Sequence, residues 1–123
     1  MIIVKLGVRF SAFRSEMYHL WEQFERVFSQ YGLPMRITCG TDGHLDTDPH
    51  SHACAYDLDT HDVPGQLREL TPDEKHSLVT SLTTVAGPTY YIFLENEGLE
   101  TEHIHWQVRK DLWPGLVKGI THV

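Results

Sequence analysis

An apolar stripe at helical spacing between residues 13 and 31 constrains the fold of this chain more than any other feature. Its members recur at three- and four-residue intervals and therefore share one face of a helix: Phe13, Met17, Leu20, Trp21, Phe24, Val27, Phe28 and Tyr31. Ser11 or Ser15 can cap the start of this helix, and Gly32 and Pro34 end it. So broad a stripe indicates a face that packs on a core rather than a surface that binds a partner.

The rest of the chain predicts a sheet and one more helix. Runs of β-branched and apolar residues indicate strands over residues 2–10, 35–39, 53–58, 89–95 and 102–109, and the short turn at 96–98 predicts a β-hairpin. Thr71, Pro72 and Glu74 form a capping box with proline in the first helical position, which predicts a helix over residues 72–86. Because strands and helices do not alternate strictly, we expect an α+β fold, with a mostly antiparallel sheet and helices on one face.

Length and charge narrow the range of functions. The chain has 123 residues, the size of one domain, so residues 1–123 are expected to form a single unit. Its 10 basic and 17 acidic residues leave a net charge of −7, which argues against partners such as nucleic acid or an anionic membrane. No apolar run approaches the ~20 residues of a membrane span, and the first residues do not read as a signal peptide.

Histidine is the unusual component, with nine residues, and the histidines with nearby acids fall in two clusters. The first cluster runs from Asp48 to Asp57, and the second is Glu102-His103-Ile104-His105. Zinc binds imidazole nitrogen and carboxylate oxygen at about 2 Å, and a catalytic zinc uses three protein ligands and leaves one position open. His50, Asp57 and His105 supply such a set of two histidines and one carboxylate.

The second cluster also has a geometric requirement. On a strand His103 and His105 point to the same face, whereas Glu102 points to the other face unless the chain turns near it. The hairpin turn just before Glu102 supplies such a place. With nine histidines some pairs arise by chance, but both clusters stand beside small or turn residues and outside the apolar helical stripe. The combination therefore favours a metal site over chance.

The two clusters together resemble a known family, the zinc D-alanyl-D-alanine carboxypeptidases and dipeptidases. Phage L-alanyl-D-glutamate endolysins share its pattern Ser-x-His-x-x-Gly-x-Ala-x-Asp, and the wider group has the hedgehog-like metallopeptidase fold. Here the pattern has His50, Ala55 and Asp57 in place, with Asp48 instead of serine and Ala53 instead of glycine. The family's second motif, an acid, two residues and a histidine, is matched by Glu102 to His105. The motifs occur in the family's order over about residues 10 to 110.

The resemblance implies a function as well as a fold. It implies that Zn²⁺ is held by His50, Asp57 and His105 and that Glu102 is the general base. His103 either contacts the oxyanion or substrate or supports a zinc ligand from behind, and the two roles are equally compatible with the resemblance. In such a site zinc acidifies a water, and the base moves its proton to the leaving amine. The implied substrate is a peptide bond of peptidoglycan. A monomer is expected, in the cytoplasm or released to the cell wall in the manner of a phage lysin.

One departure concerns substrate binding. Where the family has Tyr-Arg after Ser-Gly, this chain has Thr41-Asp42 after Cys39-Gly40, so the arginine that helps to bind a substrate carboxylate is replaced by an acid. The residues that remain as candidates for substrate binding are Arg36, His44, His52 and Trp106. Trp106 is next to His105 in the sequence. Its side chain can either line the substrate cleft or pack in the core, and the sequence is equally compatible with both roles.

Two other functions compete with the peptidase. The first is a zinc-binding domain of the same fold with a structural or binding role, which the missing arginine favours and the presence of Glu102 opposes. The second is a nuclease with a His-hydrophobic-His strand, which His103-Ile104-His105 resembles. That class also needs a nucleophilic tyrosine downstream, and no tyrosine follows Tyr91. The net charge of −7 is also unfavourable for it.

Overall fold

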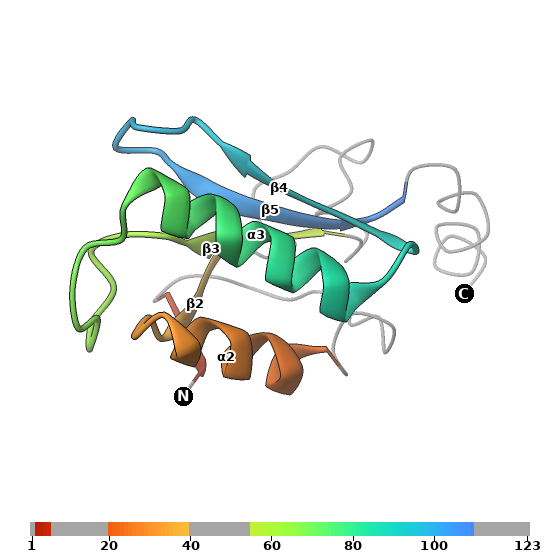
Figure 1. The fold of residues 1–123 in the computed structure, drawn as a ribbon, viewed down its shortest axis with the longest axis horizontal. Coiled ribbons are helices and arrows are strands. Elements are labelled where there is room, and N and C mark those ends of the chain that lie inside the picture. The colour runs from red at the N-terminus through yellow and green to blue at the C-terminus, as the bar shows by residue number, and fades with distance from the viewer. Residues whose placement is uncertain (1, 6–19, 40–54, 110–123) are drawn as a thin grey trace.

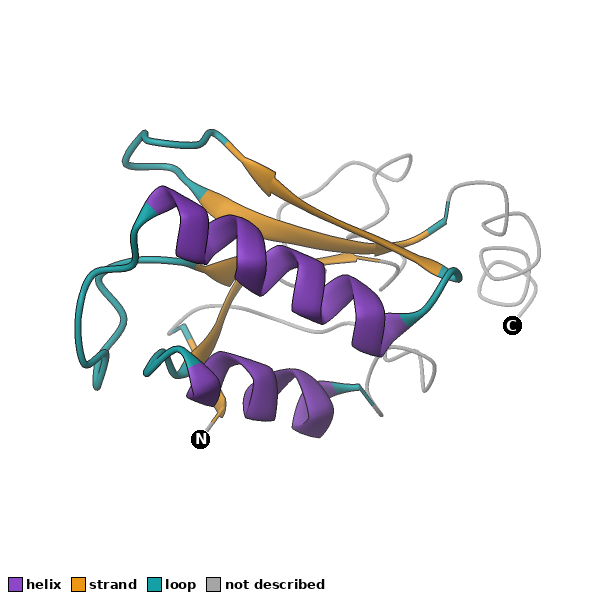
Figure 2. Ribbon diagram, viewed as in Figure 1, coloured by secondary structure: helices purple, strands orange, loops and turns teal. Residues whose placement is uncertain are grey.

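A computed structural model of the chain describes residues 2–5, 20–39 and 55–109. In these ranges it is an α+β protein with a five-stranded mixed sheet and two helices, shown in Figures 1 and 2. The sheet order is β1-β2-β3-β5-β4. The elements are β1 (Ile2–Val4), α2 (Trp21–Gln30), β2 (Met35–Cys39), β3 (Ala55–Asp59), α3 (Pro72–Ala86), β4 (Tyr90–Glu95) and β5 (His103–Val108).

The strand pairing is mostly antiparallel, as the sequence predicts. β1 pairs with β2 in parallel, whereas β2–β3, β3–β5 and β5–β4 are antiparallel. Both helices lie on the same side of the sheet (Figure 2), α2 against β1 and β2 and α3 against β4. Neither helix of the described ranges is long and apolar enough to cross a membrane.

Local sequence accounts for the helix ends. α2 ends where Gly32 takes a φ of 68°, and the backbone N–H of Leu33 donates to Phe28 O, which satisfies a carbonyl of the last turn. The predicted start of this helix, at residues 13–19, lies outside the described residues. α3 begins at the predicted capping box, with Thr71 Oγ1 accepting from the backbone N–H of Glu74 at 3.2 Å.

The core lies between the helices and one face of the sheet. Alternate residues of each central strand point into it, so β3 contributes Tyr56 and Leu58 while β5 contributes Ile104 and Trp106. The Trp106 side chain has no exposed surface, and its ring lies 4.4 Å from that of Phe24 of α2, centroid to centroid. The intervening strand residues must therefore point to the opposite face, which the two helices do not cover.

Candidate metal centre

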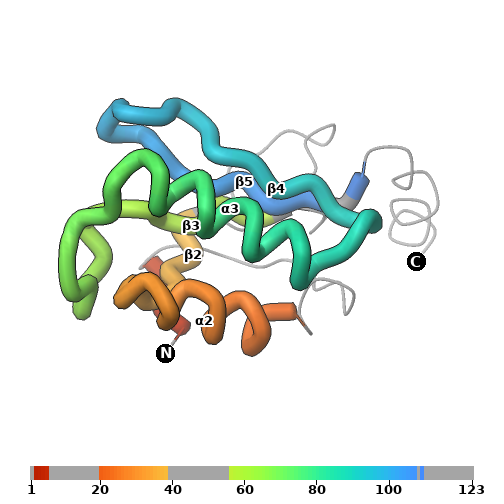
Figure 3. The backbone as a smooth tube through the Cα atoms, viewed as in Figure 1, coloured from red at the N-terminus to blue at the C-terminus, as the bar shows by residue number. Residues whose placement is uncertain are grey.

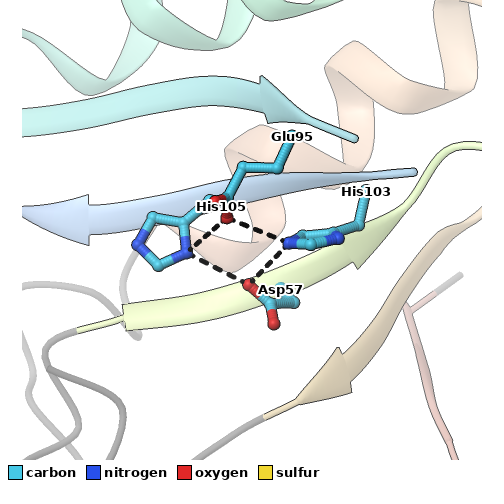
Figure 4. Close-up of side chains that lie close together, drawn as sticks. All are labelled: Asp57, Glu95, His103 and His105. Carbon is cyan, nitrogen blue, oxygen red and sulfur yellow. Dashed lines mark hydrogen bonds and ion pairs between the residues drawn. The ribbon is translucent and has the colours of Figure 1, made fainter. Parts of the chain in front are cut away.

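Four ionisable side chains converge on the face of the sheet that the helices leave uncovered, as Figure 4 shows. Asp57 comes from β3, Glu95 from β4, and His103 and His105 from β5. Strand register brings them together, because Asp57 lies opposite His105 across one side of β5 and Glu95 lies opposite His103 across the other. Since alternate strand residues share a face, all four point the same way. We call these residues the four-residue group.

The donor atoms of the group form a closed ring in which nitrogens and oxygens alternate. Asp57 Oδ1 lies 3.2 Å from His105 Nδ1 and 3.5 Å from His103 Nε2. Glu95 Oε1 lies 3.0 Å from His103 Nε2 and 3.3 Å from His105 Nδ1. Each imidazole therefore presents one nitrogen to two carboxylate oxygens.

The outer nitrogen of each imidazole faces a hydrogen-bond acceptor. His103 Nδ1 is 2.8 Å from the backbone carbonyl of Thr101, and His105 Nε2 is 2.7 Å from Gln107 Oε1. Each outer nitrogen thus donates a proton, so in the neutral imidazole the inner nitrogen has none and carries a lone pair. Histidines that bind metals are usually held in this way, with the second nitrogen donating to a carbonyl or carboxylate.

With this tautomer, the repulsion between the inner nitrogens and the carboxylates can be relieved in two ways. Two lone pairs facing two carboxylates repel, so either the imidazoles are protonated or a cation lies between the four side chains. For His105, burial disfavours the imidazolium, but hydrogen bonds to Asp57 and Gln107 and the charges of Asp57 and Glu95 outweigh burial and raise its pKa. The raised pKa records how strongly these surroundings attract positive charge.

The distances in the group suit a small cation. Zinc bonds of 2.0–2.1 Å place neighbouring donors of a tetrahedron about 3.3 Å apart. The four nitrogen–oxygen separations of the ring lie between 3.0 and 3.5 Å and so match four of the six edges of such a tetrahedron, and all donor atoms lie within 4.8 Å of one another. The group could therefore hold a metal ion, and its imidazoles and carboxylates are ligands that zinc accepts.

Two of the three zinc ligands implied by the sequence, Asp57 and His105, lie together in this group. His103, for which the resemblance implies either of two roles other than zinc ligand, joins them through its Nε2. The third implied ligand, His50, lies outside the described residues, as do His44 and His52, two of the residues expected to bind substrate.

Glu102, the implied general base, belongs to a different network. Its carboxylate accepts hydrogen bonds from Thr60 Oγ1 at 2.5 Å and Gly98 N at 2.9 Å, and pairs with Lys75 Nζ at 2.7 Å. Burial raises the pKa of Glu102, but the hydrogen bonds from Gly98, Lys75 and Thr60 and the charge of Lys75 outweigh it, so the pKa is lowered. A carboxylate with a lowered pKa and three donors is a weak proton acceptor.

The other two candidates for substrate binding have contrasting surroundings. Arg36 donates from Nη1 to Asp59 Oδ2 at 2.8 Å and lines a cavity of about 380 Å³ next to the group. Asp57 and His103 line the same cavity, so it opens directly onto the candidate metal centre. Trp106 instead packs in the core without exposed surface, which is the second of the two roles that its sequence position left open.

Glu95 is the member of the group that the sequence did not single out. It ends the predicted strand 89–95 and sits across the turn from His103. The predicted hairpin strands 89–95 and 102–109 place Glu95 near the second cluster, which was a usable signal for a second carboxylate. Its partner could not be fixed, because pairing the ends of the predicted strands puts Glu95 opposite Glu102, whereas the observed register puts it opposite His103.

Comparisons with protein-family models, with curated proteins and with solved structures found no match to this chain. What the site can do must therefore be argued from its own residues.

Proposed function

We propose that this protein is a zinc-dependent hydrolase whose metal is held by Asp57, His103 and His105. The observation that carries the proposal is the orientation of the two imidazoles. Both donate their outer N–H to a neighbouring acceptor and aim the inner nitrogen at two carboxylates. Metal-binding histidines are usually held in this way, and in the neutral rings the two inner lone pairs and the two carboxylates leave a place for a cation between them.

Within this proposal the remaining carboxylate, Glu95, is the proton acceptor. Its side chain is 40% exposed, against 21% for His103 and 11% for His105, so it stands at the solvent edge of the group. Zinc, when bound, supplies a Lewis acid that activates a water and polarises a carbonyl. The cavity of about 380 Å³ beside Asp57 and His103 is where the substrate would lie.

The substrate class rests on the resemblance to the zinc D-alanyl-D-alanine peptidases. We propose a peptide bond of a peptidoglycan stem peptide, in a domain of the hedgehog-like metallopeptidase type. The antiparallel pairing of β3 with β5, which sets Asp57 opposite His105, supports this assignment because it brings together the two motifs of the resemblance.

A second candidate function is a metal-binding domain without hydrolytic activity. The closed ring of donor atoms favours it, because structural zinc sites have four protein ligands, whereas catalytic sites keep one position open. In this candidate Glu95 is the fourth ligand. The two functions therefore differ in the role of one side chain.

Metal content tests the site itself. We expect zinc bound in a one-to-one ratio by the wild type and lost in Asp57→Ala and His103→Ala, with His76→Ala as an exposed control that retains it. His50→Ala separates the ligand set of the resemblance from the four-residue group. If His50→Ala loses zinc and His103→Ala keeps it, then His50 and not His103 is the zinc ligand. A wild type that takes up no zinc on titration would refute the proposed function.

Hydrolysis separates the two candidate functions. The substrate for this test is a synthetic stem peptide that ends in D-alanyl-D-alanine. Cleavage of a peptide bond is measured by the amino groups that it releases. We expect Glu95→Gln to keep zinc and lose hydrolysis, because the amide accepts no proton. If Glu95→Gln instead loses zinc and the zinc-loaded wild type does not cleave the peptide, the closed, non-catalytic site is correct.

A further inference from the structure

The Glu102 carboxylate joins the ends of the three strands that supply the metal centre. Glu102 itself directly precedes β5, which carries His103 and His105. Its Oε1 accepts from Thr60, which directly follows β3, and its Oε2 accepts from the backbone of Gly98, in the turn that leaves β4. One side chain therefore connects the strand of Asp57, the strand of Glu95 and the strand of the two histidines.

Lys75 neutralises this carboxylate, at the same oxygen that accepts from Thr60. Its Nζ lies 2.7 Å from Glu102 Oε1, and only 14% of the Lys75 side chain and 3% of the Glu102 side chain are exposed. A buried carboxylate requires an opposite charge and several donors, and here it has both. Because Lys75 lies in the first turns of α3, the pair also links the β4–β5 turn to this helix, whose start lies near the turn in Figure 3.

A neighbouring ion pair at the same hairpin tip provides a contrast. His76 Nε2 lies 2.9 Å from Glu97 Oε1, but these side chains are 58% and 46% exposed. Solvent screens such a pair, so it holds the tip weakly. The buried pair therefore constrains the hairpin tip more strongly than the exposed one.

We propose that Glu102 and Lys75 are positioning residues, which hold the β4–β5 turn against the end of β3 so that Glu95 and His103 converge with Asp57 on the metal. The inference rests on the proposed metal site. Glu102 also lines the cavity beside the group, but its carboxylate is occupied by Thr60, Gly98 and Lys75. The inference therefore gives Glu102 a positioning role in place of the proton transfer that the family resemblance implies.

Lys75→Met tests this role through metal binding. It leaves Glu102 buried without its cation, so the turn shifts, and we expect zinc affinity to fall about tenfold or more, as for other residues that orient ligands. The visible absorption spectrum of the cobalt-loaded protein should change as well, because it reports ligand geometry. Lys75→Arg should restore most of the affinity, and His76→Ala, one residue away, should leave affinity and spectrum unchanged.

Thr60→Val keeps the inference testable if Lys75→Met does not fold. The substitution removes one hydrogen bond to Glu102 and preserves both shape and charge, and we expect a smaller loss of zinc affinity in the same direction. Wild-type affinity and an unchanged cobalt spectrum in the folded variants would overturn the positioning role. Glu102→Gln gives a second test. If this variant binds zinc normally but no longer hydrolyses the peptide, the positioning role is wrong and Glu102 is the base.

The outcomes for the site and for the positioning role are distinguishable. If the wild type binds no zinc, the proposed function fails. If the wild type and Lys75→Met bind zinc equally, the metal site stands and only the positioning role of Lys75 and Glu102 fails.

Discussion

At the residue scale, the protonation of two imidazoles decides what the four-residue group can bind. The backbone carbonyl of Thr101 and the Gln107 side chain each accept a proton from the outer nitrogen of a histidine. A neutral ring that donates from its outer nitrogen has a lone pair at its inner nitrogen, whereas an imidazolium donates from both nitrogens and hydrogen-bonds to Asp57 or Glu95 as well. The two acceptors therefore fix the tautomer of the neutral rings, and this is the form that binds a metal.

Gln107 allows a direct test at this scale. Gln107→Leu removes the acceptor for His105 Nε2, and we expect zinc affinity to fall about 10- to 100-fold, the usual effect of losing such a partner. Competition against a chromogenic chelator measures the change. Gln107→Glu keeps an acceptor oxygen and should retain affinity. An unchanged affinity in Gln107→Leu would mean that the tautomer of His105 does not depend on this contact.

At the element scale, the start of α3 matters because this helix positions Lys75. The Thr71 hydroxyl and the Glu74 carboxylate each accept a backbone N–H at the helix start. Hydrogen bonds from the Arg68 side chain and the Thr71 backbone outweigh desolvation and, with the charge of Arg68, lower the pKa of Glu74 to about 2. The cap therefore stays ionised and intact over most of the pH range.

Thr71→Ala should destabilise the helix start. Loss of the side chain that caps α3 is expected to lower the free energy of unfolding by about 1 kcal/mol. Urea denaturation followed by circular dichroism measures it, with Ser77→Ala at an exposed position inside the same helix as the matched control. Equal stabilities of Thr71→Ala and Ser77→Ala would show that the capping box contributes nothing measurable.

On the scale of the whole molecule, the four-residue group spans three neighbouring strands of the sheet. The neighbouring strands β3, β5 and β4 pack on the core around Trp106 with one face. Their other face carries the four-residue group: Asp57, Glu95, His103 and His105. A metal bound there links β3 to the hairpin, two segments separated by α3 in the sequence. Binding should therefore stabilise the folded chain as a whole, because the unfolded chain does not preserve the site.

Zinc should raise the melting temperature accordingly. At a free zinc concentration a hundred times Kd, mass action adds about 2.7 kcal/mol. For a domain of this size, that corresponds to a shift on the order of 10 °C. Differential scanning calorimetry with and without zinc measures the shift, and Asp57→Ala should show little of it. An equal shift in Asp57→Ala would place the bound zinc elsewhere.

The secondary structure of the described residues followed largely from local patterns. The predicted helix 72–86 corresponds to α3, and the predicted strands 35–39 and 89–95 correspond to β2 and β4, the latter one residue shorter at its start. Strand 53–58 is observed as Ala55–Asp59. Periodicity and capping are properties of neighbouring residues, so the sequence alone carries them. The single-domain organisation stays a prediction.

The sequence by itself determined the α+β class, the position of α3 and the proximity of His103 and His105, since each depends on local spacing. Only the tertiary structure decided that Glu95 joins the group, that Glu102 turns to Lys75, and that Trp106 packs in the core. These outcomes depend on strand register and on where a helix packs. Both arise from contacts between segments distant in the chain, and a one-residue change of register would have sent the same side chains to the opposite face.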